Sequence, residues 1–167
     1  MDSHNYVIDT DCLVLFLNCA IGKTILRKIK IIIPPSIYYE LNLRLQKQLE
    51  NYNLQIEELD DNDVDYAAKL IHQINIKKQY KNRYLSNRNT RIKNKGECEG
   101  AAIAVKFNID IILKDGRAIT IIKKRFQHRQ NRCMNYIDFG IMILETFGSN
   151  DNIEEFKEEL RKQHVYI

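Results

Sequence analysis

Acidic residues of this chain recur where an apolar segment ends or where a helix is expected to begin. Asp9 directly follows the apolar run YVI, and one residue separates Asp115 from the run IDIIL. Glu40 lies among apolar residues after IIIPP, while Glu97 and Glu99 open a segment rich in small residues. Carboxylates that converge without compensation repel one another, and Mg²⁺ or Mn²⁺ removes that penalty because it prefers oxygen ligands. Such ions assist the attack of water on a phosphodiester, so the pattern favours metal-assisted hydrolysis of nucleic acid.

Each of these acids also has a purely structural interpretation. Asp9 alone fits a solvated strand-end carboxylate, Glu40 a helix-surface glutamate, and Asp115 a helix cap. Glu97 and Glu99 are two positions apart, which on a helix turns their side chains about 200° from each other, so only one of them can join a shared site. The order and context of the acids favour a common metal site over these separate roles.

Other chemistries have less support in the sequence. The four cysteines form no C-x-x-C pair and the four histidines are scattered, so a zinc site is not indicated. Neither a phosphate-binding glycine loop nor a nucleophile-elbow serine occurs. No apolar run approaches the roughly 20 residues of a membrane span, and the first residues carry acids where a secretory signal is basic. We therefore expect a cytoplasmic protein with no membrane segment.

The hydrophobic pattern alternates between short strand-like runs and longer helical ones, which predicts an α/β domain with a mainly parallel sheet. Because the carboxyl ends of parallel strands meet at one edge of the sheet, the acids should converge there. The expected strands are 6–8, 29–33, 54–58, 109–113 and 134–138, with 54–58 at an edge. The expected helices are 12–19, 35–49, 60–74, 96–107, 115–124, 139–147 and a last one after Asp151.

The net charge of +4 conceals a basic segment at 77–95, which carries eight lysines and arginines and no acid. Cations interleaved with tyrosines suit the phosphates and bases of single-stranded nucleic acid, although a solvated loop is an equally good interpretation. A second basic cluster, at 123–132, also favours a polyanionic partner. The residues expected to bind nucleic acid are Lys77, Lys78, Lys81, Arg83, Tyr84, Arg88, Arg91, Lys93 and Lys95.

Several segments together resemble a PIN domain, and the resemblance extends over nearly the whole chain. VIDTDCLVLFL is similar to the opening strand and helix of that family, with Asp9 as its first acid and Thr10 as the usual hydroxyl neighbour. IIIPPSIYYEL resembles the second motif, which implies Glu40 as the second acid. KGECEGAAIAVKFNIDIILKDGRA resembles the G-E-x-E-A helix and following strand of one PIN subgroup, which implies Glu99 and Asp115 as the remaining acids.

The chain departs from the family pattern at three places. Gly100 stands where alanine is usual, Asp115 is a single acid where two adjacent acids are common, and the basic segment 77–95 is long for the family. The third departure suggests that substrate or partner engagement is special to this protein.

The resemblance implies one three-layer α/β/α domain over 1–167, with the basic segment as an insertion or loop. It further implies an endoribonuclease that uses Mg²⁺ or Mn²⁺ at Asp9, Glu40, Glu99 and Asp115, commonly as a homodimer and often as the toxin of a toxin–antitoxin pair. Arg117 would contact a phosphate near the metal, and Asp11 would support the site from outside or serve as a helix N-terminal carboxylate; Glu97 is the alternative third acid. The competing hypothesis is a catalytically silent PIN-like module that binds nucleic acid or an acidic protein such as an antitoxin tail.

Overall fold

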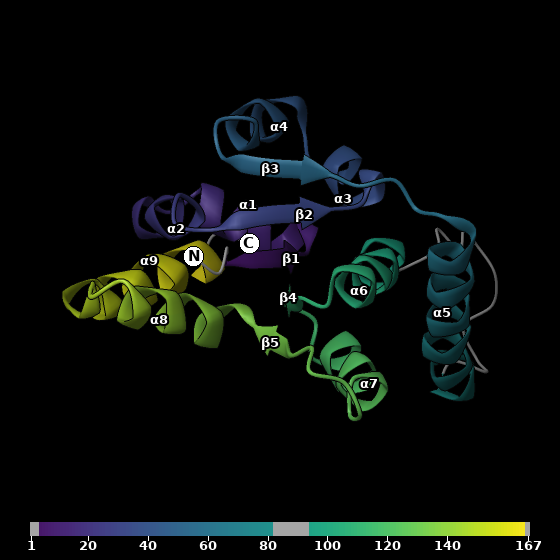
Figure 1. The fold of residues 1–167 in the computed structure, drawn as a ribbon. Helices are drawn as coiled ribbons and strands as arrows, with labels where there is room; N and C mark the ends of the chain where they lie inside the picture. Colours follow the sequence, from purple (N-terminus) through teal and green to yellow (C-terminus); the bar gives the residue numbers. More distant parts are fainter. Residues whose placement is uncertain (1–3, 82–93, 166–167) are drawn as a thin grey trace.

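Five short strands form the centre of the computed structural model, which describes residues 4–81 and 94–165. In spatial order the strands are β3-β2-β1-β4-β5, and every neighbouring pair is parallel (Figure 1). Their bounds are β1 (Asn5–Ile8), β2 (Lys30–Ile33), β3 (Asn53–Ile56), β4 (Asp110–Leu113) and β5 (Cys133–Asn135). The expected α/β class with a parallel sheet is therefore confirmed, and β3 is an edge strand as predicted.

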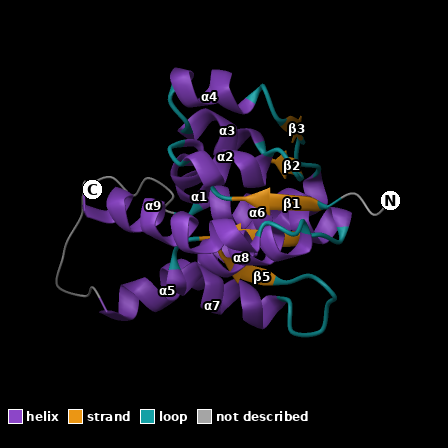
Figure 2. Ribbon diagram, turned by 90° about the vertical axis from the view of Figure 1, so that its left-hand side faces the viewer, coloured by secondary structure: helices purple, strands orange, loops and turns teal. Residues whose placement is uncertain are grey.

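Helices cover both faces of this sheet, which makes three layers (Figure 2). One face carries α1 (Thr10–Leu17), α2 (Ala20–Leu26), α8 (Tyr136–Thr146) and α9 (Ile153–Val165), which pack on one another. The other face carries α6 (Lys95–Phe107) and α7 (Gly116–Arg125), and α5 (Asp61–Lys81) packs on these two helices. The three middle strands are buried on both faces, and for that reason their sequences read as unbroken apolar runs such as Ile31–Ile33.

The segment expected as one helix over 35–49 is two helices, α3 (Pro35–Glu40) and α4 (Leu43–Leu49). Leu41 between them is extended, with ψ of 142°, and Asn42 caps α4 by accepting a hydrogen bond from the Leu45 N–H at 3.0 Å. Asparagine competes with the helix for backbone hydrogen bonds and therefore favours a cap over a helix interior. The break places Glu40 at the end of α3.

The last strand also ends earlier than expected. Asn135 accepts hydrogen bonds from the backbone N–H groups of Ile137 and Asp138, at 3.0 and 2.9 Å, and so begins α8. Residues 136–138, expected in the strand, are the first turn of that helix. The four cysteines are free and buried.

The order of the strands creates a switch point between β1 and β4. From β1 the chain proceeds to β2 on one side, and it returns later to place β4 on the other side, with Ile8 beside Ile112. The backbone N–H of Asp9 donates to Ile112 O at 3.0 Å, which continues this pairing past the end of β1. Ligands of open α/β sheets bind in the crevice that such a switch point leaves at the carboxyl ends of the strands.

An ion-pair cluster connects the beginning of α5 to α6. Lys106 Nζ lies 3.1 Å from Glu57, 3.6 Å from Asp60 and 3.2 Å from Asp63. Asp60 and Asp63 also accept each other's backbone N–H, both at 2.9 Å, and thereby cap α5. The pKa of Glu57 is lowered by hydrogen bonds from Gln55 and then Lys106, and the pKa of Asp60 is lowered first by the Asp63 N–H and also by the charge of Lys106.

We expect Lys106→Met to destabilise the protein in a pH-dependent way. Acids whose pKa is lowered by folding stabilise the folded state above their unfolded pKa, and this stability is lost as the pH falls. The Tm of Lys106→Met should therefore lie a few degrees below that of the wild type at neutral pH, and the gap should narrow below about pH 4. Lys69→Met, which removes an exposed lysine of α5, is the matched control. A gap of constant size in thermal melts across this range would contradict the expectation.

Candidate acidic site at the switch point of the sheet

Asp9 joins three elements at the switch point. The side chain is buried, with 3% exposure, and it caps α1: Oδ1 accepts from the Cys12 N–H at 2.7 Å. Its other oxygen, Oδ2, accepts from the Lys114 N–H at 3.1 Å, directly after β4. Burial raises the pKa of Asp9, while the hydrogen bonds from Cys12 and Lys114 counteract part of that rise. Asp9 is therefore a fixed, desolvated carboxylate and not a solvated strand end.

Glu40 is held beside Asp9 by the next residue of the chain. Thr10 Oγ1 donates to Glu40 Oε2 at 2.5 Å, which connects the beginning of α1 to the end of α3. The Glu40 carboxylate also lies against the beginning of α6, where a Cβ on Gly96 would be only 3.3 Å from Glu40 Oε1. Glycine at position 96 therefore allows α6 to approach α3 this closely. The hydroxyl role that the resemblance suggested for Thr10 is thus a contact to the second acid.

Glu97 follows Gly96 and is the acid of α6 that interacts with this group. Burial is the largest cause that raises its pKa, from 4.5 to about 7, and the negative charges of Asp9, Glu40 and Asp11 raise it further. Asp11 is exposed in the first turn of α1. We call Asp9, Asp11, Glu40 and Glu97 the acidic cluster. Its members lie in three separate parts of the sequence, and the fold brings them into electrostatic contact.

Glu99, the third acid implied by the resemblance, has a different partner. Its Oε1 lies 3.8 Å from Lys95 Nζ, one helical turn earlier in α6. The structure therefore couples Glu97 with Asp9 and Glu40, and this was the alternative that the sequence left open. The signal was the glycine before Glu97, because a glycine that opens a helix can mark a close approach of another element.

Asp115 and Arg117 border the acidic cluster. Asp115 is exposed and caps α7, with Oδ1 accepting from the Arg117 N–H at 2.7 Å and the Ala118 N–H at 3.1 Å. Its structural interpretation as a helix cap is thus confirmed, and a role at the metal stays a prediction. Lys114, the residue before it, holds Asp9, so Asp115 and the exposed Arg117 are at the same edge of the sheet.

The donor atoms of the acidic cluster suit a hard divalent cation, because all of them are carboxylate oxygens. Their positions are less converged than a metal site requires. Within 4–81 and 94–165, no three histidine, cysteine or acidic side chains are arranged to hold a metal ion together. The cluster therefore has the charge and the ligand type for Mg²⁺ or Mn²⁺, and its side chains have to move inward to bind one.

The basic segment 77–95 is only partly described by the structure. Lys77, Lys78 and Lys81 belong to the last turns of α5, and Lys95 begins α6. The other residues expected to bind nucleic acid lie outside the described residues: Arg83, Tyr84, Arg88, Arg91 and Lys93.

No protein-family model matches the chain, and no curated protein matches its sequence. No helix in the described parts of the chain has the length and apolar character to cross a membrane. The structure therefore defines this protein as an α/β protein with a parallel sheet and a cluster of acids at the switch point of that sheet.

The raised pKa of Glu97 predicts an unusual pH dependence of stability. Between the ordinary pKa of 4.5 and the folded value of about 7, the folded protein binds more protons than the unfolded chain, so its stability falls as the pH rises. Glu97→Gln removes that loss, and its Tm should exceed the wild-type Tm by a few degrees at about pH 8 and approach it near pH 5. Thermal melts at both pH values measure this.

Glu99→Gln is the matched control, because it makes the same change two residues away on the same helix. Its Tm difference from the wild type should be the same at both pH values. If Glu97→Gln behaved in this way too, Glu97 would titrate as an ordinary glutamate and the acidic cluster would not repel it.

Proposed function

We propose that the protein is a divalent-metal-dependent nuclease that hydrolyses RNA at the acidic cluster. The observation that carries the proposal is the raised pKa of Glu97. Its value of about 7 results from burial and from the charges of Asp9, Glu40 and Asp11. A protein gains no stability from like charges gathered around a desolvated carboxyl. Perturbed groups of this kind at the ligand-binding edge of a sheet are typical of functional sites.

Asp9, Glu40 and Glu97 are the residues that would hold Mg²⁺ or Mn²⁺, with Asp115 at the border of the site. When bound, the ion supplies positive charge that stabilises the phosphodiester during hydrolysis. Asp9 fixes the geometry, because two backbone N–H groups orient its carboxylate. Thr10 positions Glu40 through its hydroxyl, and Glu97 can take up or release a proton near neutral pH.

RNA is the proposed substrate because of the basic segment and the resemblance to PIN domains. Eight cations without an acid at 77–95, interleaved with tyrosines, provide contacts to phosphates and unpaired bases. The resemblance adds that the enzyme is a homodimer, with an antitoxin or another regulatory protein as its inhibitor, and we expect it to act in the cytoplasm.

A catalytically silent module that binds nucleic acid or a protein is the second candidate. It is favoured by one observation: in the described part of the chain, no three potential ligands are arranged to hold a metal. Calorimetric titration with Mn²⁺ separates the two candidates, because the nuclease proposal requires uptake of the ion and the release of protons from Glu97 at neutral pH.

Glu97→Gln is the sharpest test of the nuclease. Asp9→Asn is less informative, because an amide nitrogen in place of Oδ2 cannot accept the Lys114 N–H and folding would suffer as well. We expect Glu97→Gln to reduce the cleavage of single-stranded RNA in Mn²⁺ by about 100-fold or more, an effect typical of groups that hold or orient a catalytic metal. The rate of RNA cleavage by purified protein is the measurement.

Glu99→Gln is again the control and should cleave nearly as well as the wild type. A large loss in Glu99→Gln with normal cleavage by Glu97→Gln would return the third acid to Glu99, as the resemblance implies. A wild-type protein that binds RNA and cleaves neither RNA nor DNA with any divalent metal would be the silent module.

A further inference from the structure

A second basic surface lies at the end of α7 and in the loop that leads to β5. Residues 116–132 contain six lysines and arginines and no acid. Five of these cations are exposed at or after the last turn of α7, and we call them the α7 basic surface: Lys123, Lys124, Arg125, Arg129 and Arg132. Lys123, the first of them, follows Asp115 by eight residues, so the α7 basic surface begins about 12 Å along the helix axis from Asp115.

Three of these cations are in no ion pair or side-chain hydrogen bond within the described residues, although the charge of Arg129 acts on Tyr66 and that of Lys123 on Cys133. Arg132 pairs with Asp110 at 2.8 Å, and Arg125 donates to Gln73 Oε1 at 3.0 Å. Lys123, Lys124 and Arg129 form no ion pair or hydrogen bond with other described side chains. Cations in a last turn stabilise a helix through its dipole, which accounts for the lysines in part. Arg129 lies beyond the end of α7, so the helix dipole does not explain it.

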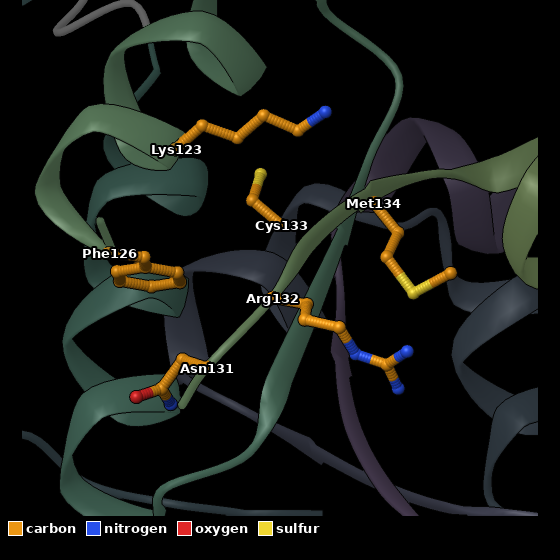
Figure 3. Close-up of a pocket in the computed structure, with 6 residues that line it drawn as sticks. All are labelled: Lys123, Phe126, Asn131, Arg132, Cys133 and Met134. Atoms are coloured by element: carbon orange, nitrogen blue, oxygen red, sulfur yellow. The ribbon is translucent and has the colours of Figure 1, made fainter. Parts of the chain in front are cut away.

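A hollow of about 330 Å³ adjoins this surface, and two of its five cations, Lys123 and Arg132, line the hollow (Figure 3). Figure 3 shows the Lys123 side chain reaching across it above Cys133, with Arg132 on its lower side. Its other lining residues are Phe126, Asn131 and Met134, so the walls are largely apolar and carry no carboxylate. The Asn131 amide donates to Ala104 O at 2.8 Å and to Ile109 O at 2.7 Å, which fixes the loop that forms one side of the hollow.

We infer that the α7 basic surface binds the phosphate backbone of single-stranded RNA, with one unpaired base in the hollow beside Lys123. This inference rests on the proposed function, because it assumes that RNA is the substrate. Unpaired cations release the counterions of a polyanion and so favour nucleic acid. An apolar hollow between cations suits an unstacked base, which a duplex does not offer. An RNA strand that follows α7 from Asp115 to this surface has to span about 12 Å.

The test compares two triple variants. Each of them removes three positive charges, and the two sets of charges lie on different parts of the protein surface. Lys123→Gln/Lys124→Gln/Arg129→Gln neutralises the unpaired cations. The matched control, Arg27→Gln/Arg44→Gln/Lys47→Gln, neutralises three exposed cations, one directly after α2 and two in α4. Binding of a fluorescein-labelled oligouridine of about 20 nucleotides, longer than the sites of single-strand binding folds, is measured by polarisation at several salt concentrations with EDTA present. Circular dichroism verifies that both variants are folded.

We expect the α7 variant to bind the oligouridine about tenfold more weakly than the wild type, and the slope of log affinity against log salt to become shallower by about 2. The control should retain the wild-type slope. Equal losses in both variants would mean that only net charge matters, and unchanged binding by the α7 variant would mean that this surface does not contact RNA; either result overturns the inference. A surface that binds polyglutamate and not RNA would overturn it as well.

Cleavage of a dinucleotide in Mn²⁺ separates this inference from the nuclease proposal, because a dinucleotide is too short to reach the α7 basic surface. Both triple variants should cleave it as the wild type does. Normal RNA binding by the α7 variant together with dinucleotide cleavage removes this inference and leaves the nuclease. Surface-dependent RNA binding without any cleavage removes the nuclease and leaves the surface.

Discussion

The buried carboxylate of Asp9 is the constraint on which the site depends. Its two oxygens accept backbone N–H groups from α1 and from the residue after β4, so the side chain cannot turn to solvent without leaving two donors unpaired. The hydrogen bonds that fix the switch point of the sheet therefore also fix a negative charge in a desolvated position. Folding and site formation share this one group.

The other acids accumulate around that charge through contacts that are equally specific. Thr10 draws the end of α3 inward by donating to Glu40, and Gly96 lets the beginning of α6 come against the same carboxylate. This close approach places Glu97 beside the other acids, where burial and their negative charges raise its pKa. Carboxylates held close together repel one another, and a bound cation or a proton reduces this repulsion.

The sequence predicted the layers and the sheet because the middle strands are buried on both faces and are apolar throughout, as in Ile31–Ile33. It did not predict the break at Leu41, because only the bond between the Asn42 side chain and the Leu45 N–H distinguishes a cap from a helix interior. In α5, which was expected from its apolar spacing, the side chain of Val64 is 51% exposed, while that of Leu70 is buried. In a helix with few apolar residues, the elements that pack against it decide which of these residues are buried.

The resemblance implies Glu99 as the third acid, whereas the structure brings the other glutamate of α6, Glu97, into electrostatic contact with Asp9. Either glutamate of α6 could face Asp9 until the rotation of the helix about its axis was known. That rotation is set by Gly96 against Glu40 and by Gly100, where a Cβ would lie 3.1 Å from Val7 Cγ1. These are contacts between elements far apart in the sequence, and no local pattern reports them.

NMR of the Glu97 carboxyl carbon, with and without Mg²⁺, measures whether the acidic cluster raises the pKa of this side chain and binds a divalent cation. We expect a Glu97 pKa of about 7 in the metal-free protein. This pKa should decrease clearly when Mg²⁺ is added, because the cation favours the charged carboxylate. A metal-free pKa near the ordinary 4.5, or a raised pKa that Mg²⁺ leaves unchanged, would contradict these expectations.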